Sequence, residues 1–147
     1  MPRFLSLAIT SSERHSTFFS RLMFMAFLLA ATCFVGNAAA LTLKPYSADA
    51  VKTAQAKGQP IALHFHADWC PTCRAQQSAL RTMETTNGPA VTVFVVDYDK
   101  QKALRRTLKV RSQSTFIVYR GRKETGRLAG DTDPEKIEAV LRTALSP

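Results

Sequence analysis

Residues 61–73 read Ile61-Ala62-Leu63-His64-Phe65-His66-Ala67-Asp68-Trp69-Cys70-Pro71-Thr72-Cys73. Residues 61–67 have the length and apolar character of a buried β-strand, which leads directly to two cysteines separated by two residues. A helix is expected from about Pro71 through Met83, because proline suits the first helical position, where its missing N–H has no intrahelical role. The sequence therefore predicts a strand, a Cys-x-x-Cys turn and a helix in direct succession.

A cysteine pair at the start of a helix has a specific chemistry. The first thiol lies near the positive end of the helix dipole and near free N–H groups, which stabilise a thiolate. The second thiol lies one turn inside, close enough to form a disulfide with the first. We therefore predict that Cys70 is an exposed attacking nucleophile and Cys73 a buried resolving thiol, exchanging electrons with a substrate through a mixed disulfide.

The same cysteine spacing is also half of many zinc sites. His64 and His66 lie on the preceding strand and project to the same face by strand alternation. The alternative function is therefore a metal-binding or metal-delivery module that uses His64, His66, Cys70 and Cys73. We favour the redox interpretation, because four ligands from a strand and the adjoining helix start would need a tetrahedral geometry that the spacing does not ensure.

Residues 1–40 have the layout of a secretory signal peptide. Three arginines precede an apolar run over residues 22–36, and Asn37-Ala38-Ala39-Ala40 supplies an Ala-x-Ala cleavage site. The apolar run is shorter than the about 20 residues of a membrane-spanning helix. Cleavage after Ala40 leaves one domain, residues 41–147, and removes Cys33, so that only Cys70 and Cys73 remain. We therefore predict a periplasmic or otherwise exported protein with no membrane span, whose two thiols serve chemistry rather than disulfide stapling.

The chain is basic, with 20 Lys and Arg against 11 Asp and Glu. The predicted mature part keeps a net charge of about +7, because the leader holds three arginines and one glutamate. Basic residues group most tightly over residues 100–111, where no aromatic interleaving or nucleic-acid motif accompanies them. We interpret this group as a solvated helix face and expect no nucleic-acid partner.

The rest of the chain alternates helices and strands. Helices are expected from Ser47 or Asp49 up to Gly58, over residues 100–108, and from Asp133 onward. Strands are expected over residues 90–97, 114–119 and 123–128, and the first of these is rich in β-branched residues, which favours a central position with parallel neighbours. The predicted fold is α/β, with a central mixed sheet of about four to five strands flanked by helices on both faces.

The segment over residues 65–73 resembles the active-site segment of the thioredoxin family, and the element order over residues 43–146 is similar to that of the family. Residues 110–116 resemble the loop that faces the dithiol, and Ala129-Gly130 resembles the turn before the last helix. The resemblance implies a thioredoxin-like fold and thiol–disulfide oxidoreductase activity on protein thiols and disulfides. It also implies a monomer without a bound organic cofactor, and a redox partner that regenerates the dithiol or disulfide. The docking surface implied by the resemblance consists of Trp69, Pro71, Thr72, Ser114 and Thr115.

Three positions depart from the pattern of the family. Ser114 stands where thioredoxins have a cis-proline, so we expect a trans bond or a costly cis bond, and its hydroxyl is a candidate donor to the Cys70 thiolate or to a substrate. His64 stands where thioredoxins bury a carboxylate behind the resolving cysteine, and it is either a proton acceptor or a structural core histidine. Val95 replaces the lysine that thioredoxins pair with that carboxylate. The two replacements are consistent with each other, because a buried lysine without its carboxylate partner is costly.

Overall fold

The computed structural model describes residues 40–146, so the predicted signal peptide lies outside the described residues except for Ala40. Along the chain the elements are β1 (Thr42–Pro45), α2 (Ala48–Ala56), β2 (Pro60–His66), α3 (Pro71–Thr85), β3 (Thr92–Asp97), α4 (Lys102–Thr107), β4 (Thr115–Arg120), β5 (Lys123–Ala129) and α5 (Pro134–Arg142). Within these residues no helix is both long and apolar enough to cross a membrane.

The strands form one five-stranded mixed sheet in the order β1-β3-β2-β4-β5. Strand β3 lies between β1 and β2 and runs parallel to both, as its β-branched sequence predicts. Strand β4 pairs antiparallel with β2, and β5 pairs antiparallel with β4. The predicted mixed sheet, with parallel neighbours on both sides of β3, is therefore confirmed.

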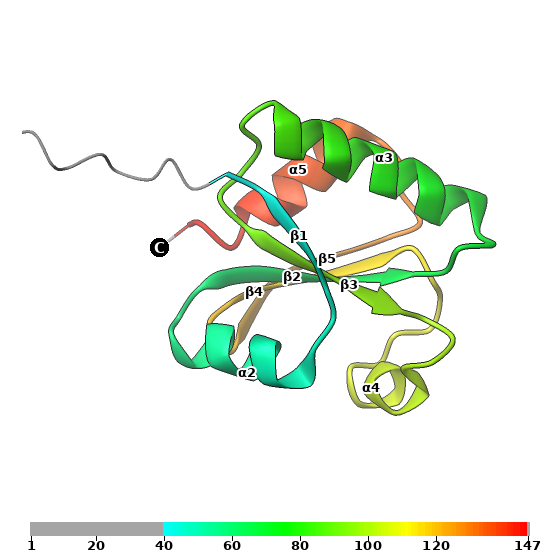
Figure 1. Ribbon diagram of the computed structural model, residues 1–147, viewed down its shortest axis with the longest axis horizontal. Coiled ribbons are helices and arrows are strands. Elements are labelled where there is room, and N and C mark those ends of the chain that lie inside the picture. Colours follow the sequence, from blue (N-terminus) through cyan, green and yellow to red (C-terminus); the bar gives the residue numbers. More distant parts are fainter. Residues whose placement is uncertain (1–39, 147) are drawn as a thin grey trace, which may run out of the picture. The chain divides into compact units, whose positions relative to one another are not determined.

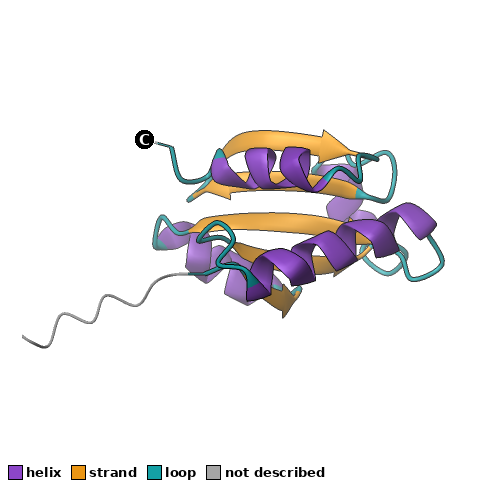
Figure 2. Ribbon diagram, turned by 90° about the horizontal axis from the view of Figure 1, so that it is seen from above, coloured by secondary structure: helices purple, strands orange, loops and turns teal. Residues whose placement is uncertain are grey.

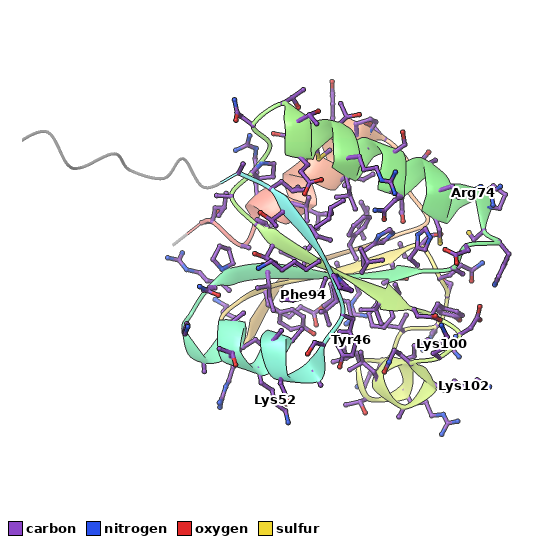
Figure 3. The ribbon with its side chains drawn as sticks, in the orientation of Figure 1. Tyr46, Lys52, Arg74, Phe94, Lys100 and Lys102 are labelled. Carbon is purple, nitrogen blue, oxygen red and sulfur yellow. The ribbon has the colours of Figure 1, made fainter. Side chains whose placement is uncertain are left out.

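Helices cover both faces of the sheet. Helices α3 and α5 lie on one face and α2 on the other (Figure 1), and the view onto the first face shows α3 and α5 in front of the strands (Figure 2). Alternation along β2 divides the core between the two faces. Ile61, Leu63 and Phe65 belong to the cluster under α2, together with Phe94 on β3 (Figure 3). Ala62 belongs to the cluster under α3 and α5, and His64 faces the same side.

Three of the differences between the structure and the sequence-based expectation have a clear physical reason. Strand β1 was not expected, because it is only four residues long, mostly exposed and ends in proline. Helix α4 begins at Lys102 rather than residue 100, because the Asp97 carboxylate accepts hydrogen bonds from the backbone N–H groups of residues 99 and 100 and holds them in a turn. Strand β4 begins at Thr115 rather than Ser114, whose φ of 61° is incompatible with a strand.

Candidate active site

The two cysteines lie at the N-terminus of α3, where the sequence predicts them. Cys70 is the N-cap residue, and the backbone N–H of Cys73 donates to Cys70 Sγ at 3.4 Å. Both thiols are free, and together with Ala67 they form a small buried cluster against Tyr98. Cys73 is buried as predicted, but Cys70 is only 4% exposed, so the expectation of an exposed thiol was wrong. The exposed side chain at this turn is that of Trp69, which is 61% exposed.

Ser114 lies directly against both sulfurs. Its Oγ is 3.0 Å from Cys73 Sγ and 3.3 Å from Cys70 Sγ. The peptide bond before Ser114 is trans, and the positive φ of 61° costs a non-glycine residue of the order of 1 kcal/mol. Two backbone hydrogen bonds hold this conformation: Ser114 N–H donates to Phe65 O at 2.8 Å, and Gly130 N–H donates to Ser114 O at 2.9 Å. The chain therefore replaces the proline of the family with a hydroxyl that contacts the dithiol.

The two thiols have opposite pKa shifts. The hydrogen bond with Ser114 is the largest influence on Cys70 and, with the backbone N–H of Cys73, it lowers the Cys70 pKa from 9.0 to about 7. Burial raises the pKa of the Cys73 thiol, and its contact with Ser114 offsets only part of this effect. At neutral pH Cys70 is therefore partly a thiolate, whereas Cys73 retains its proton.

A buried polar network lies behind Ser114, and its central residue is Gln76 on α3. Gln76 Nε2 donates to Ser114 O at 3.1 Å and to Asp131 O at 2.7 Å, which leaves Gln76 Oε1 to accept from His64 Nε2 at 2.9 Å. Sequence reasoning missed Gln76, although one signal was available. Residues 73, 76, 80 and 83 form the buried stripe of α3, and Gln76 is the one polar amide in that stripe.

His64 is bonded to this network and not to the dithiol. Its ring is fully buried, stacks on Phe116 at a centroid distance of 4.4 Å and makes no hydrogen bond to Cys73. Within residues 40–146, its Nδ1 atom has no hydrogen-bond partner. Burial lowers the His64 pKa from 6.5 to about 4, so the ring is neutral at physiological pH. Val95 is its neighbour on β3, in direct register.

The four residues of the alternative metal site do not come together as a ligand set. His66 Nε2 pairs with Asp68 Oδ1 at 3.1 Å, and His64 Nε2 is taken by Gln76. Across residues 40–146, the structure contains no group of three or more His, Cys, Asp or Glu side chains that could hold a metal ion.

The predicted docking residues divide into an outer and an inner set. Trp69 and Pro71 are exposed and Thr72 is half-buried, and Trp69 Nε1 donates to Asp99 Oδ2 at 2.8 Å. Ser114 and Thr115 are each only 3% exposed. The Ser114 hydroxyl faces the sulfurs and the Thr115 hydroxyl donates to Ser112 O at 2.8 Å, so neither contributes much to the outer surface.

Several cationic side chains lie at the end of the fold that carries the cysteines. Arg74 at the start of α3 and Lys100 and Lys102 near α4 lie at the same end of the fold (Figure 3). Arg74 Nη1 donates to Asp68 O at 2.9 Å, and Lys100 pairs with Asp97 at 2.9 Å. Arg105 stacks over the Tyr98 ring at 3.6 Å, which fixes α4 beside the cysteine cluster.

A mixed sheet with a Cys-x-x-Cys turn at the start of a covering helix defines a dithiol redox protein. The Thioredoxin family model matches residues 42–143, and the chain belongs to the thioredoxin family. It is 31% identical to Thioredoxin-1 of Drosophila melanogaster over 81 residues, which cover 55% of this chain and 75% of that protein. It is 29% identical to Thioredoxin H2-1 of Oryza sativa subsp. japonica over 86 residues, which cover 58% of this chain and 61% of that protein.

Solved structures agree with this assignment. The crystal structure of Trxlp from Edwardsiella tarda EIB202 is 37% identical to this chain, with a TM-score of 0.62, and the match covers 68% of this chain and 98% of that one. A mutant thioredoxin from Halobacterium salinarum NRC-1 is 16% identical with a TM-score of 0.61, a likeness of fold that covers 74% of this chain and 93% of that one. The protein is thus a thiol–disulfide oxidoreductase. Its family acts on protein disulfides and is regenerated by a reductase.

Proposed function

We propose that this oxidoreductase is exported through a signal peptide cleaved after Ala40 and that it exchanges electrons with proteins in the periplasm. The observation that carries this proposal is the leader sequence itself, with its basic start, apolar run and Ala-x-Ala site. The start of the folded domain is compatible with the same cleavage site. Leu41 is 1% exposed in the core and β1 starts at Thr42, so cleavage after Ala40 keeps every strand of the sheet.

In the proposed reaction Cys70 attacks and Cys73 resolves. The lowered pKa of Cys70 supports its role as the nucleophile, because the thiolate is the reactive form. Cys73 is fully buried, so a large protein substrate has no direct access to it. Its backbone N–H contacts Cys70 Sγ, so Cys73 lies close enough to attack a mixed disulfide formed at Cys70. Trp69, Pro71 and Thr72 form the outer surface on which a protein substrate would dock.

The proposed partners are protein thiols and disulfides, with a separate redox partner that restores the dithiol or disulfide. We propose that the domain acts as a monomer and without nucleic acid. Its cations near α4 are partly engaged within the fold by Asp97 and Tyr98, which agrees with a solvated basic face.

Export is tested by expressing the full chain in a bacterium and determining the N-terminal sequence and the cell fraction of the product. The expected result is a periplasmic protein that starts at Leu41. An Ala40→Lys variant, which spoils the cleavage site, is the matched control and should retain its leader. A cytoplasmic product that still carries residues 1–40 in the wild type would overturn the proposal.

The roles of the cysteines are tested by trapping. A Cys73→Ser variant should accumulate mixed disulfides with proteins at Cys70, because the thiol that releases them is gone. A Cys70→Ser/Cys73→Ser double variant is the control and should trap none. If Cys73→Ser traps no protein, or if the trapped bond is at Cys33 instead, the proposed roles are wrong. Metal analysis of the same samples tests the alternative metal module.

A further inference from the structure

The resolving step requires Cys73 to lose a proton, and the structure limits where that proton can go. Cys73 is fully buried, so bulk water does not reach its thiol. Among residues 40–146, three polar groups besides Cys70 contact its sulfur: Ala67 N–H at 3.4 Å, Phe65 O at 4.0 Å and Ser114 Oγ at 3.0 Å. The amide keeps its hydrogen, and a peptide carbonyl accepts a hydrogen bond without retaining a proton. Of the three, only the hydroxyl both accepts a proton and releases one.

We propose that the Ser114 hydroxyl relays a proton from Cys73 to the sulfur that leaves Cys70. The same oxygen lies 3.3 Å from Cys70 Sγ, so it contacts both the attacking thiol and the sulfur that is attacked. Ser114 is itself only 3% exposed, which keeps competing water away from this path. Ser114 is then a catalytic residue of this protein at a position where its family has a proline.

The step balances as follows when the protein reduces a substrate disulfide. After Cys70 attacks, its sulfur is bonded to one substrate sulfur. Cys73 Sγ then forms a bond with Cys70 Sγ, and the bond between Cys70 Sγ and the substrate sulfur breaks with its electron pair on the substrate. The Cys73 proton passes to Ser114 Oγ while the Ser114 hydroxyl hydrogen passes to the departing sulfur. The dithiol is oxidised by two electrons, and the substrate leaves as a neutral thiol.

Gln76 is the positioning residue for this relay. Its amide donates to Ser114 O at 3.1 Å and to Asp131 O at 2.7 Å, and its oxygen accepts from His64. These bonds fix the left-handed backbone of Ser114, which in turn aims the hydroxyl at the sulfurs. His64 donates a hydrogen bond to Gln76 and makes none to Cys73. It therefore holds Gln76 in place and is not the direct proton acceptor.

The test compares two leaving groups in the resolving step. Glutathione leaves poorly as a thiolate and benefits from a donated proton, whereas 5-thio-2-nitrobenzoate is an acidic aromatic thiol that leaves without one. Protein expressed from the full chain, with Cys33→Ser so that only two thiols react, is mixed with oxidised glutathione or with the aromatic disulfide. Acid quenching and mass spectrometry then follow the decay of each mixed disulfide at Cys70. This decay rate does not depend on the thiolate content of free Cys70.

Ser114→Gly is the main variant, because glycine adopts a φ of 61° without strain and removes the hydroxyl. Loss of a general acid–base group predicts a decay about 10²-fold slower for the glutathione mixed disulfide, and a clearly smaller loss for the aromatic one. Ser114→Ala should show the same discrimination. The matched control is Ser112→Ala, because the Ser112 side chain is exposed and its hydroxyl contacts neither sulfur; it should leave both rates unchanged.

Equal slowing of both mixed disulfides by Ser114→Gly, or no slowing of the glutathione one, would overturn the relay. The inference rests on thiol–disulfide exchange at Cys70, and the two can fail separately. If exchange itself is wrong, the wild type forms no mixed disulfide at Cys70 or never resolves it.

Gln76→Leu tests the positioning role through a double-mutant cycle. Alone, it should slow the decay of the glutathione mixed disulfide more than that of the aromatic one, as Ser114→Gly does. Combined with Ser114→Gly, it should change the discrimination no further, because its effect passes through the hydroxyl. A further selective slowing of the glutathione mixed disulfide in the double variant would refute the positioning role of Gln76, since a general loss of stability slows both leaving groups alike.

Discussion

Acid should destabilise this protein through His64. The ring is fully buried, its Nε2 donates to Gln76, and its Nδ1 has no acceptor among the described residues. A second proton would therefore place a charge in the core. Burial lowers the His64 pKa from 6.5 to about 4, and the amide side chains beside the ring offset only part of this effect. Between these two pH values the unfolded chain binds more protons than the folded protein. Stability is complete above pH 6.5 and falls as the pH falls toward 4.

The size of the effect follows from the pKa difference. One pKa unit corresponds to about 1.36 kcal/mol, so a shift from 6.5 to about 4 corresponds to about 3 kcal/mol in the free energy of unfolding. About 2 kcal/mol of this should be lost between pH 7 and pH 4.5. A His64→Gln variant retains an N–H donor for Gln76 and does not titrate, so it should lack this loss. Asp97 and Asp131, whose pKa values are lowered by hydrogen bonds, contribute equally to both proteins and cancel in the comparison.

Urea unfolding followed by circular dichroism at several pH values provides the measurement. The wild type should lose about 2 kcal/mol more than His64→Gln between pH 7 and pH 4.5. An NMR titration of the imidazole resonance that disappears in the variant gives the His64 pKa directly. If the free energy of unfolding has the same pH dependence in the wild type and in His64→Gln, the reasoning from burial is wrong. A midpoint near pH 6.5 in the NMR titration of His64 would show the same.

Three further predictions concern other parts of the molecule. Ser114→Gly should raise the Cys70 pKa from about 7 toward the ordinary thiol value, because a hydrogen bond to a charged group contributes about 1.5–3 kcal/mol. Alkylation of Cys70 at pH 7 should therefore slow roughly tenfold. An unchanged pH profile of the alkylation rate would contradict this prediction. Asp99→Ala removes the 2.8 Å bond from Trp69, the only tryptophan of the chain, so fluorescence anisotropy should fall; equal anisotropy would mean that the bond does not restrain the indole. Gly126→Ala places a Cβ 2.8 Å from Thr143 Oγ1 and 2.9 Å from Val140 Cγ2. This overpacking should lower the free energy of unfolding by about 1–3 kcal/mol, as measured by thermal unfolding. An unchanged melting temperature would show that α5 can shift without penalty.

The elements next to the cysteines were predictable because their signals are local. An apolar run of strand length, a Cys-x-x-Cys turn and a proline at the first helical position indicate β2 and α3 without any long-range information. Strand β1 has no such signal, because its four residues are ordered by pairing with β3, which lies about 50 residues further along the chain. Sequence patterns report which faces are buried, but they do not report partners that are distant in sequence.

The polar interior of the site shows the same limit. The sequence indicates that the usual buried charges are absent, since His64 and Val95 occupy their places. It does not indicate that Gln76 joins His64 to the Ser114 backbone, because that contact depends on the positive φ of Ser114 and on the turn at residues 130–131. Burial of Cys70 is also a tertiary effect, caused by packing against Tyr98 and by the contact with Ser114.

The unequal pKa values of the two thiols have a consequence for the energy of electron transfer. Below about pH 7 both reduced thiols hold their protons, so two electrons are taken up with two protons and the reduction potential falls by about 59 mV per pH unit. Above that pH, Cys70 is a thiolate while burial keeps the proton on Cys73, so only one proton accompanies the electrons and the slope falls to about 30 mV per pH unit. Outside the cytoplasm, where we propose that the protein acts, its reduction potential would thus respond about twice as steeply to acidification as to alkalinisation.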